Sequence, residues 1–219
     1  IGKMALAGRN KKETWDQWYT GRFDLHPMKG LSVKGDYSWN RYSTVQKFHR
    51  KEMTQTFPEG RDPYLVETPN YVRNYNSNNI YQAINVWAEY KKSFNDVHNL
   101  SLMAGYNQEE KTYASTSYTM TDLYDNEMPI SDLAINYKEN EEGSDIWRVQ
   151  GAFFRLNYDY RSKYLLEVNG RYDGSSKYAK HDRWAFFPSA SVGWRISEEK
   201  FFKSLSKVVD NLKIRASIG

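Results

Sequence analysis

Strict alternation of apolar and polar residues is the feature that most limits how this chain can fold. In residues 30–42, GLSVKGDYSWNRY, every second position from Leu31 to Trp39 is apolar, aromatic or glycine, and the positions between them are polar. Side chains of a β-strand point to opposite faces with a period of two. The stretch therefore predicts a strand with one apolar and one polar face.

The same alternation recurs along the chain, with single exceptions at Trp18 and Trp87. It predicts eight strands, at residues 14–25, 30–42, 80–94, 100–107, 153–160, 164–172, 186–196 and 211–218. Repeated alternation of this length is typical of strands, whereas an amphipathic helix would show a period of about 3.6 residues. We therefore expect an all-β fold in which about eight strands form an antiparallel meander.

The connections between the expected strands alternate between short and long. Residues 26–30, 95–99 and 161–163 are short connections, 43–79 and 111–146 are long, and 173–183 is intermediate. Transmembrane β-barrels of the bacterial outer membrane combine short periplasmic turns with longer outer loops. The asymmetry favours a segment of an antiparallel transmembrane β-barrel.

The apolar face of these strands would then meet lipid, and the polar face would border a wet lumen. The polar face carries many charges: Lys34, Asp36, Glu89, Asp159, Glu167, Arg171, Arg195, Lys213 and Arg215. Aromatic residues at strand ends are typical of membrane-interface girdles: Trp15, Trp39, Tyr42, Phe94, Tyr164 and Trp194. Mean hydropathy is −0.85, and no run of about 18 apolar residues exists that could form a transmembrane helix.

Two other folds fit the same alternation. One is a soluble, secreted β-sandwich that binds carbohydrate, whose apolar face would be its core. The other is a complete eight-stranded barrel, whose interior would have to be filled by side chains. The many charges on the polar face argue against a filled interior, because charged side chains are rarely buried without a partner.

Two local features interrupt the strand pattern. Residues 197–210, SEEKFFKSLSKVVD, predict a short helix in a periplasmic turn, with Ser197 as its cap and Phe201, Leu205 and Val208 on one face. Pro188 lies within the expected strand 186–196 and cannot donate a backbone hydrogen bond, so we expect a β-bulge there.

No residue pattern indicates catalysis, a cofactor or a metal site. The chain has no cysteine, and its four histidines, His26, His49, His98 and His181, lack the spacing of metal ligands. The acidic stretch 139–145 lacks the ordered spacing of a calcium loop. The net charge of +4 comes from 31 basic and 27 acidic residues, a balance that does not suggest nucleic-acid binding. We therefore expect a protein that is not an enzyme.

Four sequence blocks follow one another over residues 152–219: RLNYDYRSKYLLE, RYDGSSKY, RWAFFPSASVGWRISEEKFF and LKIRASIG. In their order and spacing these blocks resemble the SusC/RagA family of TonB-dependent outer-membrane transporters. The segments FDLHPMKGLSVKGDYSWNRY and HNLSLMAGYNQEE also resemble hairpins of that family. Residues 43–79 and 111–146 carry no such resemblance.

The resemblance implies a 22-stranded barrel in the outer membrane that is closed by an N-terminal plug domain. It implies active import of glycan fragments or peptides, powered by a TonB–ExbB–ExbD complex and assisted by a SusD-like surface lipoprotein. It further implies that residues 1–219 are an internal part of the barrel domain, without the plug domain, the TonB-interacting segment and the remaining strands.

Five residues are candidates for contact with the cargo. Tyr64, Tyr71 and Tyr75 lie among Asn and Arg residues in the long connection 43–79, where they could stack on sugars or bind peptides. Trp87 and Arg155 occupy positions on the polar face of their expected strands. A surface loop packed for structural reasons would explain the three tyrosines equally well.

Overall fold

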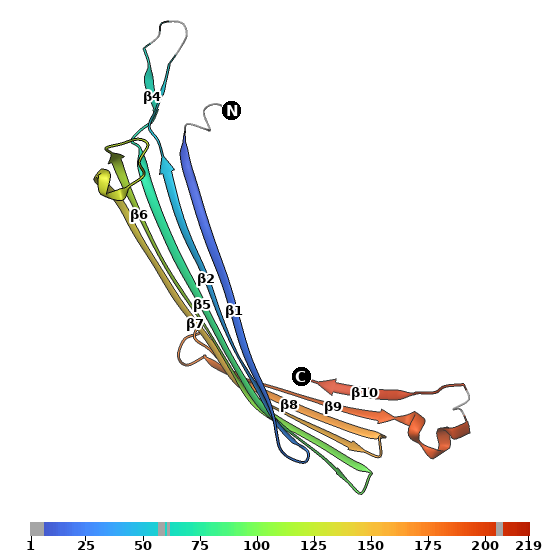
Figure 1. Cartoon of the computed structure of the whole chain (residues 1–219). Coiled ribbons are helices and arrows are strands. Elements are labelled where there is room, and N and C mark those ends of the chain that lie inside the picture. Colours follow the sequence, from blue (N-terminus) through green and yellow to red (C-terminus); the bar gives the residue numbers. More distant parts are fainter. Residues whose placement is uncertain (1–6, 57–59, 61, 205–207) are drawn as a thin grey trace. The chain divides into compact units, whose positions relative to one another are not determined.

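The computed structural model describes residues 7–56, 60, 62–204 and 208–219, and most of them are in β-strands (Figure 1). Eight strands form one sheet in the order of the chain: β1 (Gly8–Met28), β2 (Leu31–Arg50), β5 (Tyr71–Phe94), β6 (His98–Leu123), β7 (Ala134–Tyr160), β8 (Tyr164–Ser175), β9 (Trp184–Arg195) and β10 (Lys213–Ile218). The predicted all-β meander of eight strands is confirmed.

The remaining elements are short. Strands β3 (Met53–Gln55) and β4 (Tyr64–Glu67) pair antiparallel as a second sheet, and three 3-10 helices are η1 (Ser131–Leu133), η2 (Ile196–Glu198) and η3 (Lys200–Ser204). Within the described ranges, no helix has the length and apolar character needed to cross a membrane.

The strands are much longer than the alternation predicted. Strands β5, β6 and β7 contain 24, 26 and 27 residues, and they take up large parts of the expected connections 43–79 and 111–146. The prediction of long irregular loops in these two ranges was therefore wrong. The connections that remain are the β3–β4 hairpin region and residues 124–133.

The chain divides into two compact units, and several strands run from one into the other. Unit 1 contains residues 1–18, 40–81 and 111–146, and unit 2 contains residues 19–39, 82–110 and 147–219. Neither unit has an extended apolar core: the only buried apolar residues among those described are Val72 and Leu123 in unit 1, and Ala83 and Phe202 in unit 2. A β-sandwich would bury one whole face of its sheets, so this fold does not favour that alternative.

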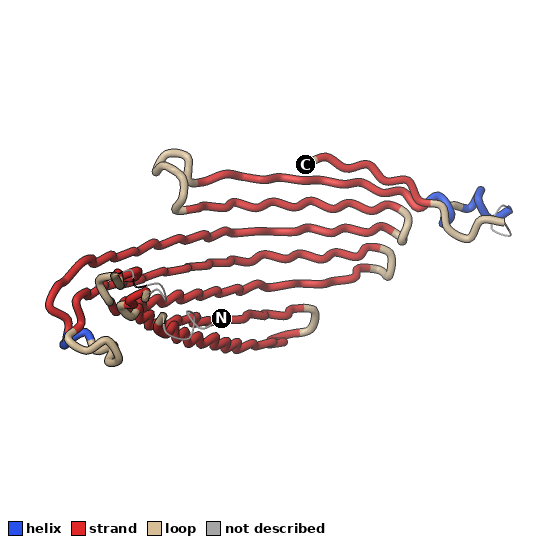
Figure 2. The backbone as a smooth tube through the Cα atoms, turned by 90° about the horizontal axis from the view of Figure 1, so that it is seen from above, coloured by secondary structure: helices blue, strands red, loops and turns tan. Residues whose placement is uncertain are grey.

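The tight turns of unit 2 explain how its strands stay in register. Asn95 and Asp96 in one turn, and Arg161 and Ser162 in another, all have positive φ between 51° and 58°. Positive φ at both central residues is the mark of a type I′ turn, whose twist matches that of the strands it joins. Figure 2 shows these turns at the same end of the unit 2 strands as η2 and η3, while the 176–183 connection lies at the other end.

Pro188 fits into β9 without the predicted bulge. The β8–β9 register runs from Tyr164↔Trp194 to Gly174↔Trp184 without a shift, and Pro188 pairs with Gly170. Backbone hydrogen bonds join odd-numbered partners, such as Arg195 N to Lys163 O at 2.7 Å. Hydrogen-bonded and non-hydrogen-bonded pairs alternate along an antiparallel ladder, so Pro188 lies in a non-hydrogen-bonded pair. Its missing N–H is therefore not needed by β8, and the prediction of a bulge was wrong.

The predicted helix in residues 197–210 was also wrong in its type and in its buried face. The described part forms η2 and η3, and Ser197 lies inside η2, where its hydroxyl donates to Asn211 Oδ1 at 3.4 Å instead of capping. Phe202 is buried, whereas Phe201 and Val208 are 64% and 85% exposed. The predicted position Leu205 lies outside the described residues.

Candidate functional site

One face of unit 2 presents an uncharged band whose length suits a membrane. In β8, the positions from Tyr164 to Tyr172 on this face are Tyr, Leu, Val, Gly and Tyr. This segment is nine residues long, and a transmembrane β-strand needs about 9–11 residues. At one end Tyr172 stacks on Trp184 with ring centroids 5.0 Å apart, and at the other Tyr164 lies 6.3 Å from Tyr160. Aromatic pairs thus bound the uncharged band at both ends.

The face that contains the opening stretch shows the same character. Among its apolar residues Tyr37 is exposed, and Leu31, Val33 and Trp39 are only partly covered. Their side chains therefore do not pack into a protein interior. An apolar surface left uncovered over several neighbouring strands indicates contact with lipid or with another protein.

The opposite face of unit 2 is lined by polar side chains that bond to one another. Arg155 Nε donates to Asn169 Oδ1 at 2.8 Å, and Asn169 Nδ2 donates to Glu167 Oε1 at 2.9 Å. Arg171 pairs with Asp173 at 2.9 Å. Such a face is compatible with water and would be costly to place in lipid.

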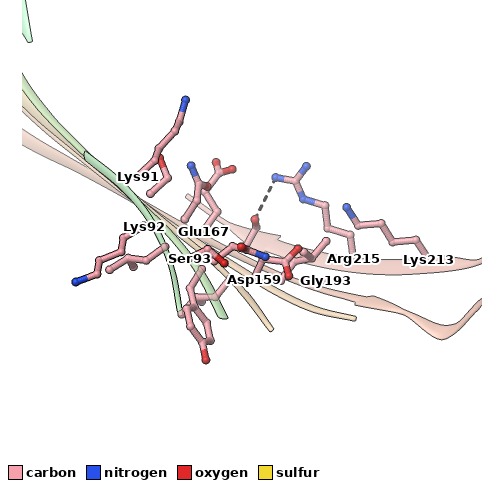
Figure 3. Close-up of a pocket in the computed structure, with 16 residues that line it drawn as sticks. Lys91, Lys92, Ser93, Asp159, Glu167, Gly193, Lys213 and Arg215 are labelled. Carbon is pink, nitrogen blue, oxygen red and sulfur yellow. Dashed lines mark hydrogen bonds between the residues drawn. The ribbon is translucent and has the colours of Figure 1, made fainter. Parts of the chain in front are cut away.

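A hollow of about 510 Å³ opens in unit 2 between residues of β5, β6, β7, β8, β9 and β10. In Figure 3, Lys91, Glu167 and Arg215 project to one side of the strands, while Lys92 projects to the other. Arg215 donates to Ser191 Oγ at 3.1 Å. Neither Lys213 nor Arg215 forms an ion pair in the part of the chain that the structure describes, so the hollow offers two cationic groups.

Two of the predicted contact residues, Trp87 and Arg155, lie in unit 2. A Cβ atom added to Gly105 would lie 2.7 Å from Trp87 Cβ and in contact with the ring of Phe153, so these two aromatic side chains flank the glycine on one face. The Arg171 guanidinium lies 5.5 Å from the centre of the Phe153 ring. Arg155 is two residues from Phe153 on the same strand and therefore shares its face.

Two other predicted residues, Tyr71 and Tyr75, come together in unit 1. They line a hollow of about 380 Å³, which we call the aromatic hollow, formed by Gln46, Phe48, Tyr71, Arg73 and Tyr75. Tyr71 stacks on Phe48 with centroids 5.5 Å apart, and the Tyr75 and Tyr113 hydroxyls lie 3.1 Å from each other. The hollow combines aromatic rings with a guanidinium and an amide.

The fifth predicted residue does not join this group. Tyr64 lies in β4 and is 52% exposed, and its hydroxyl donates to Gln55 Oε1 at 3.4 Å. The prediction missed Gln46, Phe48, Arg73 and Phe153, which the structure places beside the candidates. Phe153 had one available signal, since it is an aromatic residue at a polar position of an alternating strand.

The acidic and histidine-containing segments form no metal site in the described residues. No group of three His, Cys, Asp or Glu side chains is close enough to hold an ion. Glu141, from the acidic stretch 139–145, pairs with Arg73 at 3.1 Å. His98 Nδ1 lies 2.6 Å from the Tyr158 hydroxyl, which accounts for its position beside the turn.

The turn that holds η2 and η3 is fixed to unit 2 through Glu199. Its carboxylate accepts hydrogen bonds from Lys163 Nζ at 2.8 Å, Tyr164 Oη at 2.8 Å and Trp194 Nε1 at 3.3 Å. The hydrogen bond from Lys163, followed by that from Tyr164, lowers the pKa of Glu199. The turn is therefore attached to the ends of β8 and β9 by this carboxylate.

The chain matches a family model described as TonB dependent receptor-like, beta-barrel, over residues 4–219. The chain belongs to this family. Curated relatives agree with the resemblance seen in the sequence. The TonB-dependent receptor P39 of Formosa agariphila is 34% identical over 130 residues, which are 58% of this chain and 12% of that protein. The TonB-dependent receptor SusC of Bacteroides thetaiotaomicron is 45% identical over 67 residues, 31% of this chain and 7% of that protein.

Solved structures support the same fold for this member of the TonB-dependent receptor family. The structure of the RagAB peptide transporter aligns with a TM-score of 0.81 at 17% identity, over 99% of this chain and 23% of that chain. The RagAB peptide importer in the closed-closed state gives a TM-score of 0.81 at 18% identity, with the same coverage. The chain thus spans about a tenth of the length of the curated relatives it matches, and under a quarter of these transporter chains.

Proposed function

We propose that residues 1–219 form part of the barrel wall of a longer outer-membrane receptor that imports nutrients. The observation that carries the proposal is the separation of faces in unit 2, where a nine-residue uncharged band bounded by aromatic pairs backs onto a face of bonded charges. Such a strand suits a wall with lipid on one side and a water-filled path on the other. Family membership supports the same reading.

The proposal extends to cargo and partners. The names of the relatives, SusC and RagAB, support a SusC-like importer of glycan fragments or peptides that works with a SusD-like lipoprotein. Energy would come from the TonB–ExbB–ExbD complex through parts of the receptor beyond this chain. The chain would carry no chemistry of its own, and its task would be to shape the path and to contact the cargo.

The 22-stranded barrel and its plug domain belong to the same proposal. The eight strands in sheet order β1 to β10 would supply about a third of such a wall. Of the predicted contact residues, we propose that Tyr71 and Tyr75 in the aromatic hollow, and Trp87 and Arg155 beside Phe153, contact cargo. Tyr64 remains a candidate on the exposed β4 hairpin.

Deletion of the gene tests import. The deletion strain is grown on individual glycans and on peptide mixtures as the sole carbon source and compared with the parent and with a strain carrying the restored gene. We expect growth to fail on one cargo class and to return with the gene. Unchanged growth on every substrate would count against import.

A further inference from the structure

The aromatic hollow of unit 1 is built before any ligand arrives. Gln46 is held by a hydrogen bond from its Nε2 to Asn10 Oδ1 at 2.8 Å, and Arg73 by a hydrogen bond from its Nε to Ser117 Oγ at 3.0 Å. The rings are held as well, because Phe48 stacks on Tyr71. Side chains already fixed by their neighbours lose little entropy when a ligand binds.

The hollow also has unused hydrogen-bonding capacity. Within the described residues, Gln46 Oε1 and Tyr71 Oη take part in no hydrogen bond, although both belong to side chains that line the hollow. An amide oxygen accepts and a phenol hydroxyl both donates and accepts. A ligand with several hydroxyl groups could use both.

The charges at the hollow are already neutralised. Arg73 Nη2 lies 3.1 Å from Glu141 Oε2. Arg50, whose guanidinium lies 4.7 Å from the Tyr71 ring centre, pairs through Nη1 with Glu67 Oε2 at 3.1 Å. An anionic ligand would have to compete with these carboxylates for the two arginines. The pairing therefore favours an uncharged ligand.

The backbone around the hollow is not available to a ligand. Strands β2 and β5, which supply all five residues, are hydrogen-bonded neighbours inside the sheet. A peptide cannot add here as an extra strand, because that mode of binding needs an unpaired strand edge. Recognition must rest on side chains alone, that is, on aromatic rings and planar polar groups.

These observations fit a sugar ring, which has an apolar C–H face to stack on an aromatic side chain and hydroxyl groups around its edge. We propose that the aromatic hollow is a subsite for a neutral pyranose unit of a glycan. The volume of about 380 Å³ lies near the lower end of ligand pockets and suits a short part of a chain. This inference rests on the proposed import function, for which it names the cargo class.

Calorimetric titration of the full-length receptor in detergent tests the subsite. The probes are four neutral hexasaccharides (malto-, cello-, xylo- and mannohexaose), the anionic hexagalacturonate and a hexa-alanine peptide. We expect at least one neutral probe to bind, and Phe48→Ala to weaken it about tenfold. Phe48→Tyr keeps the ring and should retain the affinity. Tyr124→Ala is the matched control, since this ring is 86% exposed and lies outside the hollow.

A second variant tests the subsite even if the Phe48→Ala variant misfolds. Tyr71→Phe removes only the unused hydroxyl and keeps the ring stacked, and we expect it to weaken neutral-sugar binding about fivefold. The proposal is overturned if no neutral probe binds, if neither variant changes the affinity, or if only hexagalacturonate or the peptide depends on Phe48. Loss of growth in the deletion strain together with unchanged binding by both variants would reject the subsite and leave import standing. Unchanged growth of the deletion strain together with weakened binding by both variants would reject import and leave the subsite standing.

Discussion

The two units are built from the same long strands, yet their surfaces differ in kind. In unit 2, β8 has no charge on one face from Tyr164 to Tyr172, while its other face carries Glu167 and Arg171. In unit 1, residues 71–81 of β5 and 136–145 of β7 place polar residues on both faces. The contrast indicates that unit 2 separates two different solvents, whereas these stretches of unit 1 present no apolar face to a membrane.

The difference extends to how each unit is held together. Unit 2 relies on tight turns and on aromatic pairs at the ends of its band. Unit 1 relies on buried amides: Asn70 Nδ2 donates to Leu123 O at 3.1 Å, and Leu123 N donates to Asn70 Oδ1 at 2.7 Å. Asn126 likewise exchanges two hydrogen bonds with the Glu52 backbone. A strand extension in water needs such polar bonds because no lipid covers its faces.

The largest effect should follow from placing a charge on the uncharged band. Val168 lies midway between Tyr164 and Tyr172, so Val168→Arg should destabilise the receptor by about 2–4 kcal/mol in lipid. The matched change Asn76→Arg, at an exposed position of unit 1, should stay within about 0.5 kcal/mol. Urea unfolding of the receptor in phospholipid vesicles measures both. An equal loss of unfolding free energy in Val168→Arg and Asn76→Arg would show that the two units do not differ in their surroundings.

The next largest effect should come from the amide clamp of unit 1, the pair of hydrogen bonds between the Asn70 side chain and the Leu123 backbone. Asn70 is 5% exposed, and Asn70→Ala leaves the N–H and C=O of Leu123 without partners, at a cost of about 1–3 kcal/mol. We expect faster hydrogen exchange in residues 122–134 and unchanged exchange in β8. Asn76→Ala, which removes an exposed amide, serves as the control. Undiminished protection of 122–134 in the Asn70→Ala variant would show that the clamp does not hold this region.

The smallest effect should be a pH dependence confined to unit 1. His49 is 3% exposed and its Nε2 has no partner within the described structure. Burial, followed by the nearby charge of Lys51, lowers the pKa of His49 below its ordinary value of 6.5. Between that value and the lowered one, the unfolded chain binds a proton more readily than the folded chain. Unit 1 therefore has its full stability well above pH 6.5 and loses part of it as the pH falls through that value.

Hydrogen exchange at several pH values, corrected for the intrinsic exchange rate, measures this effect. We expect protection of residues 122–126 to fall between about pH 7.5 and pH 5.5. The His49→Asn variant should show no such fall. A pH dependence that persists in His49→Asn would show that His49 is not the group responsible.

The sequence predicts unit 2 far better than unit 1, and the reason is physical. Alternation arises where the two faces of a strand meet different surroundings, so the strand around Leu166 and Val168 is visible in the sequence. Residues 71–79 and 111–123 pair with neighbouring strands, but polar residues occupy both of their faces. Even the buried positions of β6 include Ser117, Thr119 and Thr121, so these stretches show no alternation and were expected to be loops.

The candidate site could likewise be predicted only in part from the sequence. Tyr71 and Tyr75 could be paired in advance, because residues four apart on a strand share a face. Their neighbours Gln46 and Phe48 come from β2, and only the register between strands brings them together. Residues 197–210 matched a helical period through Phe201, Leu205 and Val208. Three apolar positions are too few to distinguish an α-helix from the 3-10 turns η2 and η3 that the described part forms.

Spin-label accessibility measures which faces of the two units meet lipid and which meet water. Because the chain contains no cysteine, single labels can be introduced at chosen positions. Labels are placed at Leu166, Val168, Glu167 and Asn169 in unit 2, and at Asn76 and Ser77 in unit 1, of the receptor in phospholipid vesicles. We expect oxygen, which partitions into lipid, to reach Leu166 and Val168, and a water-soluble nickel chelate to reach the other four positions. Nickel access at Leu166 and Val168, or an oxygen-accessible face in unit 1, would contradict this expectation.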